Sequence, residues 1–101
     1  MRVVKNLCKE LNEGDKKLNF SYRLIENNYK GREVYGIEIE REDFVHNILT
    51  NIERDSVEKI SPNKEKVFEL VQKLYDFQVS PIHLIDIIGE DIDNYVADFT
   101  W

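Results

Sequence analysis

The feature that most restricts the fold of this 101-residue chain is the order of two hydrophobic periods along it. Apolar residues alternate with polar ones over residues 18–24 and 35–40, which is the period of a half-buried β-strand. Beyond residue 61 they recur every three or four positions, which is the period of an amphipathic helix. Strands that precede all helices predict an α+β domain: an antiparallel meander of three to four strands followed by two C-terminal helices packed on one sheet face.

The N-terminal segment, residues 3–11, is ambiguous. Val3, Leu7 and Leu11 have helical spacing, whereas adjacent valines and the turn cluster at residues 12–15 are typical of a strand entering a hairpin; we favour the strand. The next turn is predicted at residues 27–31, where Gly31 can adopt a positive φ. Gly36 lies inside a strand pattern, which predicts a bulge or a close approach of another backbone.

Residues 42–60 have the least regular pattern. We predict a connection over residues 42–47 and a strand near residues 48–58. A short helix over residues 42–51 is the alternative, because five apolar residues there have helical spacing: Phe44, Val45, Ile48, Leu49 and Ile52. Against it stand Asn47, Thr50 and Asn51, which are poor helix formers.

Two Ser-Pro pairs predict the helix starts. Ser61-Pro62 and Ser80-Pro81 each place a capping hydroxyl before a proline suited to the first helical position, and such a cap contributes roughly 1 kcal/mol. The first helix is expected over residues 62–76, with four residues forming its buried stripe: Val67, Leu70, Val71 and Leu74.

The second helix is expected over residues 81–97. Its predicted buried seam is Ile85, Ile88, Ile92, Tyr95 and Phe99. Leu84 and Ile87 widen this apolar surface, so its first half is expected to be nearly enclosed. Gly89 either lies inside the helix, where glycine lowers helix stability by about 1 kcal/mol relative to alanine, or ends one helix after Ile88.

Length and composition predict a single domain over residues 1–101. No apolar run reaches the ~18 residues that span a bilayer, and the first residues lack the apolar core of a secretory signal. The single cysteine, Cys8, is unable to form an internal disulfide. These features predict a cytoplasmic protein without a membrane segment, in which Cys8 is buried and structural.

Charge is distributed unevenly. The net charge is −6, and no Lys or Arg follows Lys73, whereas six acidic residues do: Asp76, Asp86, Glu90, Asp91, Asp93 and Asp98. A negative surface repels phosphate backbones, so we expect no nucleic-acid binding. The charge distribution is compatible with a basic protein partner or with self-association.

Four segments, in this order, carry a resemblance to a known family: YRLIENN (22–28), YGIEIE (35–40), the helix start at Ile60-Ser61 and VSPIHLIDIIGEDI (79–92). Together they resemble a family of short bacterial proteins, mainly from spore-forming Gram-positive bacteria, that is known only as a domain of unknown function. The resemblance is expected to cover residues 18–95, leaving out the N-terminal strand and the last residues. It implies a bacterial cytosolic protein but no activity, so no site residue is carried over.

The last helix offers one candidate metal site. His83, Asp86, Glu90 and Asp93 recur every three or four residues and form one polar stripe if the helix is continuous. A histidine with carboxylates can bind a divalent cation, with His83, Asp86 and Glu90 as the candidate ligands. A solvated helix face is the interpretation that we favour, so no metal or cofactor is expected.

Other clusters do not predict catalysis. Four acidic residues end a strand (Glu38, Glu40, Glu42 and Asp43), but Glu38 and Glu40 are expected on a solvated sheet face. Cys8 and the two histidines show no signature of a nucleophile–base pair, and the common phosphate- and metal-binding motifs are absent from the sequence. We therefore expect no enzyme activity.

Aromatic residues near turns and at the chain end mark a candidate interaction surface: Tyr29, Phe99 and Trp101. Phe77, between the helices, is expected to cap the core. The two terminal aromatics are expected to dock either on the domain or on another molecule. The preferred function is a non-catalytic protein-interaction or regulatory module whose sheet keeps one uncovered, partly apolar face. The alternative is a small metal-binding protein or hydrolase that uses the stripe on the last helix.

Overall fold

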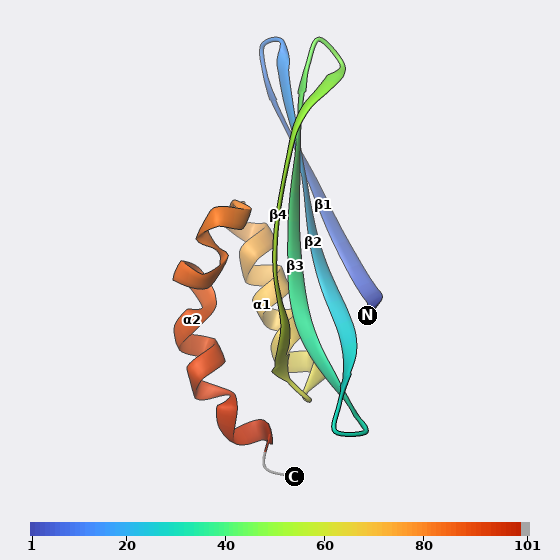
Figure 1. Ribbon diagram of the computed structural model, residues 1–101. Helices are drawn as coiled ribbons and strands as arrows, with labels where there is room; N and C mark the ends of the chain where they lie inside the picture. The colour runs from blue at the N-terminus through green and yellow to red at the C-terminus, as the bar shows by residue number, and fades with distance from the viewer. Residues whose placement is uncertain (100–101) are drawn as a thin grey trace.

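The structure, a computed structural model, describes residues 1–99 and has a four-stranded antiparallel sheet in the order β1-β2-β3-β4. The strands are β1 (Arg2–Glu13), β2 (Lys16–Tyr29), β3 (Arg32–Val45) and β4 (Ile48–Ser61). The helical segments are α1 (Lys64–Asp76), α2 (Leu84–Asn94) and two 3₁₀ helices, η1 (Pro81–His83) and η2 (Val96–Phe99). The predicted α+β meander with two C-terminal helices is therefore confirmed (Figure 1).

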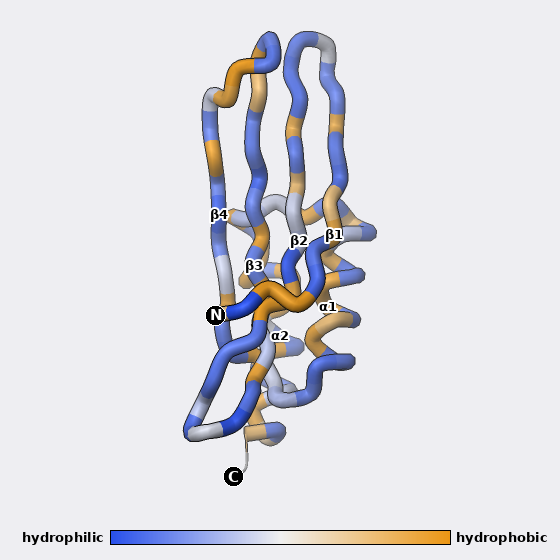
Figure 2. Tube along the Cα trace, turned by 90° about the vertical axis from the view of Figure 1, so that its right-hand side faces the viewer, coloured by the Kyte–Doolittle hydropathy of each residue, from blue (hydrophilic) through white to orange (hydrophobic). Residues whose placement is uncertain are grey.

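The molecule has two layers. Figure 1 shows the sheet nearly edge-on with both helices on one side, and Figure 2 shows the opposite sheet face with the helices behind it. At one end the strands extend beyond the helix layer, so the β1–β2 and β3–β4 turns project freely, and the molecule measures 51 × 23 × 18 Å. Of the helices that the structure describes, none has the length and apolar character needed to cross a membrane.

The core lies between the helices and one face of the sheet. Strand alternation places four β2 residues on this face: Leu18, Phe20, Tyr22 and Leu24. The helices contribute the whole predicted stripe of α1, together with Leu84 and Ile88 of α2. The Tyr22 hydroxyl donates a buried hydrogen bond of 2.9 Å to the carbonyl oxygen of Val79, which fixes the loop between the helices to the sheet.

The N-terminal segment forms strand β1, as favoured. Its register with β2 sets Leu7 opposite Tyr22 and Leu11 opposite Leu18, on the side of the sheet that carries the helices. Leu7 and Leu11 are both half-buried there. Burial on one face of a strand thus explains the apolar residues of this segment, whose spacing was also compatible with a helix.

Gly36 confirms the predicted close approach. A Cβ at this position would overlap the carbonyl oxygens of Val57 and Glu58, because β4 crosses directly over the glycine. The β3–β4 register shifts at the same point, between the pair Ile37–Val57 and the pair Tyr35–Ser61. Gly36 therefore lets the end of β4 fold over β3.

The prediction for residues 42–47 is wrong over its first part. β3 continues to Val45, and only His46 and Asn47 form the turn, both with positive φ. The predicted strand near 48–58 exists and extends to Ser61, and the alternative helix over 42–51 does not form. Pairing of β3 with both β2 and β4 satisfies the backbone on each side, which outweighs a short helical pattern.

The start of the first helix differs from the prediction, and the start of the second lacks only the predicted side-chain cap. α1 begins at Lys64, and its N-cap is Asn63, whose side-chain oxygen accepts a hydrogen bond from the Lys66 amide. Ser61 instead ends β4, where its hydroxyl accepts from the Asn63 amide and donates to Asp98. Ser80 precedes η1 as predicted, with Pro81 in its first position, but among residues 1–99 its hydroxyl caps no amide.

The buried side of α2 is also rotated from the prediction. Leu84 and Ile88 are fully buried, whereas Ile85 is 51% exposed and Ile87 is exposed as well. Gly89 lies inside a helix that continues to Asn94, so it does not end α2. The buried line is thus Leu84, Ile88, Ile92 and Tyr95, and Ile85 belongs to the solvent side.

Candidate interaction surface

The predicted metal stripe is a row of separate solvated side chains. Because α2 is continuous, Asp86, Glu90 and Asp93 share its exposed side ("the acidic row"). His83 lies in η1, with its Nδ1 3.7 Å from a carboxylate oxygen of Asp86. Residues 1–99 hold no group of three or more His, Cys, Asp or Glu side chains that is arranged to bind a metal ion.

The uncovered sheet face carries an ion-pair network as well as apolar residues, among them Ile25 and Ile52. Arg23 donates to Glu38 at 2.8 Å and to Glu40 at 3.0 Å, and Arg54 also pairs with Glu40. Glu40 is only 8% exposed, so the expectation that it is solvated is wrong. Burial disfavours the Glu40 carboxylate, but the hydrogen bonds from Arg54 and Arg23 outweigh burial and lower its pKa.

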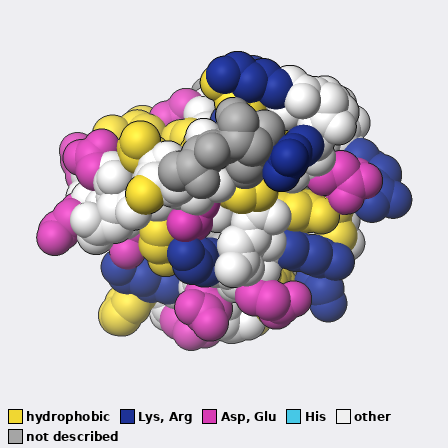
Figure 3. All heavy atoms as spheres, turned by 90° about the horizontal axis from the view of Figure 1, so that it is seen from below, with side chains coloured by type: hydrophobic (Ala, Val, Ile, Leu, Met, Phe, Trp, Pro, Cys, Tyr) yellow, Lys and Arg dark blue, Asp and Glu magenta, His cyan; other side chains and the backbone are white. Residues whose placement is uncertain are grey.

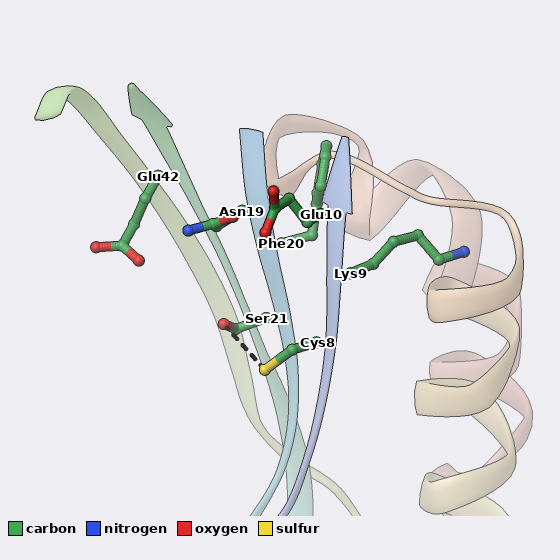
Figure 4. A pocket seen from close by; sticks show the side chains of 7 residues that line it. All are labelled: Cys8, Lys9, Glu10, Asn19, Phe20, Ser21 and Glu42. Atoms are coloured by element: carbon green, nitrogen blue, oxygen red, sulfur yellow. Dashed lines mark hydrogen bonds between the residues drawn. The ribbon is translucent and has the colours of Figure 1, made fainter. Parts of the chain in front are cut away.

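Cys8 is exposed on this same face, which contradicts its predicted burial. Its Sγ lies 3.8 Å from Ser21 Oγ in a shallow hollow that Glu10, Asn19 and Glu42 also line (Figure 4). Neighbouring Lys9 extends from the other face of β1 and donates to the Tyr75 carbonyl oxygen at 2.6 Å. Cys8 is exposed because odd and even residues of β1 face opposite sides, and Leu7 takes the covered side.

Of the predicted aromatic surface, Tyr29 and Phe99 pack on each other. Their ring centroids are 5.7 Å apart in an edge-to-face arrangement, so Phe99 docks back onto the domain. Trp101 lies outside the residues that the structure describes. Phe77 is 72% exposed and does not cap the core. Figure 3 views the end of the molecule with the β2–β3 turn and the Tyr29–Phe99 pair. Among its coloured side chains, apolar groups are interspersed with both signs of charge.

The exposed side of η1, α2 and η2 carries an apolar stripe of Ile82, Ile85 and Val96, which borders Ile92 of the buried line. Ile82 is 69% exposed and Val96 is 63% exposed, while Ile92 is half-buried. Both ends of the stripe face β4, because Ile82 borders a hollow with Ile52 and Val96 borders another with Lys59. Helical spacing places the acidic row directly beside this stripe. The helical period alone does not predict this stripe, because it assigns Ile85 to the core.

The outer edge of β4 lies beside the first turn of this stripe. Within residues 1–99, β4 pairs with β3 alone, so its other edge has no neighbouring strand. Between this edge and η1 is a hollow of about 420 Å³, here called the β4–η1 hollow, lined by Ile52, Glu53, Arg54, Asp55, Pro81 and Ile82. Edge, hollow and stripe form one continuous side of the molecule.

Comparison with known proteins gives one family match. Residues 1–94 match a family that is described only as being of unknown function. The match includes the N-terminal strand, which the expected range of residues 18–95 left out. No curated protein and no solved structure matches the chain.

Proposed function

Because the chain belongs to the family of unknown function DUF6514, we propose its function from the structure: a non-catalytic protein-interaction module that binds with the side formed by η1, α2 and the edge of β4. The observation that carries this proposal is the exposure of Ile82 and Ile85 next to the outer edge of β4, which pairs with no further strand among residues 1–99. Fully burying one such side chain contributes roughly 1.5–3 kcal/mol, so a partner that covers them gains substantial affinity.

Single exposed apolar residues are common on proteins, but a continuous line of them is typical of interaction sites. The apolar stripe runs from η1 to η2 on one side of the helical segment. The acidic row follows it, and no Lys or Arg lies in the chain after Lys73. Charge complementarity favours a partner segment that combines apolar with basic side chains.

The ionisable groups also favour binding over catalysis. Glu40, one of the two buried carboxylates that the structure describes, is neutralised by Arg23 and Arg54, and its pKa is lowered. General acid–base catalysts near neutral pH need the opposite shift for a carboxylate. This arrangement is suited to holding the sheet face together.

The proposal is tested by selecting peptides from a random displayed library against the immobilised full chain. We expect the selected peptides to lose at least about tenfold in affinity for the double variant Ile82→Glu, Ile85→Glu, because it places charge in the apolar contact. They should be enriched in Lys and Arg, and their binding should weaken with salt.

Ile48→Glu is the matched control, since Ile48 is an equally exposed isoleucine at the β3–β4 turn, away from η1. Circular dichroism establishes that all variants are folded. Selected peptides that bind the double variant as tightly as the native chain would contradict the proposed surface.

A further inference from the structure

We propose that the edge of β4 accepts an extended segment of the partner as a fifth strand, with Lys or Arg side chains opposite Glu53 and Asp55. This inference rests on the proposed function, because it names the conformation and charge of the segment that binds there. An unpaired strand edge presents N–H and C=O groups to such a segment, and along this edge the Ser56 N–H also donates to Asp55 Oδ1 at 2.8 Å.

The part of the edge that can pair regularly is well defined. β4 pairs without interruption from Asn51 to Val57, opposite Asp43 to Ile37. Register shifts bound this stretch at both ends, where β4 no longer follows an even ladder. Residues 51–57 therefore form a straight edge long enough for a short added strand.

Strand alternation assigns a face to each side chain along this edge. Glu53 lies opposite Arg41 and Asp55 opposite Ile39, so both are on the side of the sheet that carries η1. Arg54 lies opposite Glu40 and faces the uncovered side. An added strand that matches this pattern carries a basic residue opposite Glu53, an acidic residue opposite Arg54 and a basic residue opposite Asp55.

Glu53 supplies a specific acceptor for such a basic residue. One of its carboxylate oxygens lies 3.2 Å from Arg41 Nη2. The other, Oε2, is a buried atom that has no hydrogen-bond partner among residues 1–99. An unsatisfied buried acceptor is unfavourable, and a Lys or Arg entering the β4–η1 hollow would satisfy it. The aliphatic stem of that side chain would contact Pro81 and Ile82, which line the hollow.

The same charges disfavour a second copy of this chain as the occupant. Antiparallel pairing of two copies centred on Arg54 sets Arg54 opposite Arg54 and Glu53 opposite Asp55. Centring the pair on Glu53 or Asp55 sets that carboxylate opposite its own copy. Like charges directly opposite each other destabilise strand pairing, so these three registers are unfavourable for a second copy, whereas the edge is complementary to a basic strand.

The experiment titrates the full ¹⁵N-labelled chain with the peptide Thr-Val-Lys-Glu-Lys-Val-Thr, capped at both ends. Its palindromic sequence allows either strand direction. We expect amide shifts concentrated in residues 51–57 and at least about tenfold weaker binding of the inverted peptide Thr-Val-Glu-Lys-Glu-Val-Thr, since that peptide sets like charges opposite Glu53 and Asp55. Equal binding of the two peptides, or shifts outside this edge, would overturn the inference.

Three variants test which residues of the β4 edge determine the preference between the peptides. Asp55→Lys should narrow the preference for the basic peptide without reversing it, because only one of the three opposite-charge pairs becomes like-charged, and Asp55 is exposed. Glu53→Gln keeps an acceptor for Arg41 and should weaken binding of the basic peptide severalfold. Glu65→Lys makes the same charge change on exposed α1 and should leave the preference unaltered.

The strand inference and the proposed function fail in distinguishable ways. If library peptides depend on Ile82 and Ile85 but the basic peptide leaves residues 51–57 unshifted, strand addition is wrong and the interaction module stands. If the basic peptide binds this edge while library peptides ignore Ile82 and Ile85, the apolar stripe is not the binding surface.

Discussion

Gly36 is the residue on which the path of β4 depends. The carbonyl oxygens of Val57 and Glu58 occupy the space that a side chain at this position would need. Backbone atoms of a paired strand are unable to move aside as a flexible side chain does. A glycine is therefore required here for steric reasons, although it weakens an ordinary strand.

Gly36→Ala is expected to lower the free energy of unfolding by about 1–3 kcal/mol, the usual range for overpacking a rigid site. Urea denaturation of the two proteins measures the difference.

The matched control is Gly89→Ala, where the added Cβ would lie 3.8 Å from Ile85 Cγ2 in ordinary contact. Alanine inside a helix should raise stability by roughly 0.5–1 kcal/mol. An unchanged unfolding midpoint for Gly36→Ala would show that β4 does not need to cross so closely.

Among the elements, η2 is held by one carboxylate. Asp98 accepts a hydrogen bond of 2.8 Å from the Ser61 hydroxyl and hydrogen bonds of 3.0 and 3.2 Å from Lys66 Nζ. Hydrogen bonds from Lys66 and Ser61 lower the pKa of Asp98 below its ordinary value of 3.8. The C-terminal segment is thus joined to the end of β4 and the start of α1.

We expect this contact to be sensitive to acid. A carboxylate whose pKa is lowered by folding stabilises the fold above the unfolded-state pKa, and that stabilisation is lost as the pH falls through the folded-state pKa. The stability of Asp98→Asn should therefore lie below that of the native chain at neutral pH, and the gap should close below pH 3.8. Urea denaturation across this pH range measures it.

Asp93→Asn is the control for this element, because Asp93 is exposed on α2 and also becomes a neutral amide. It should remain close to native stability at neutral pH. A gap between Asp98→Asn and the native chain that persists at low pH would show that the amide disturbs packing instead of removing a charged contact.

At the scale of the whole molecule, the sheet extends beyond its helices and leaves the β4 edge open. Such edges promote association between copies unless charge or irregular geometry prevents it. In this chain, Glu53, Arg54 and Asp55 at the centre of the regular stretch supply the charge, and the register shifts supply the irregularity.

The native chain should therefore be monomeric in light scattering, whereas Glu53→Val with Asp55→Val should show a mass that rises with concentration. Removing both carboxylates abolishes the like-charge opposition and adds β-branched residues. Glu65→Val with Glu69→Val on α1 makes the same change in composition and should stay monomeric. Equal masses for the two double variants would show that the carboxylates of Glu53 and Asp55 do not prevent self-association through β4.

Local patterns predicted much of the fold because burial on one face leaves a period in the sequence. The alternation over residues 18–24 and the stripe of α1 correspond directly to the observed core. The close approach at Gly36 was predictable for the same reason, since it is a property of one residue in one strand. Of the candidate surface, only the acidic row could be recognised in advance.

What the sequence determined by itself is the type and order of the elements, because helical and strand periods are local. Which side of an element meets the core is decided by its neighbours. α2 covers the sheet with Leu84 and Ile88, so Ile85 is left outside. Pairing with two strands extends β3 through residues 42–45, and pairing of β1 with β2 exposes Cys8. The proposed binding side arises between β4 and η1, two segments that only the tertiary structure brings together.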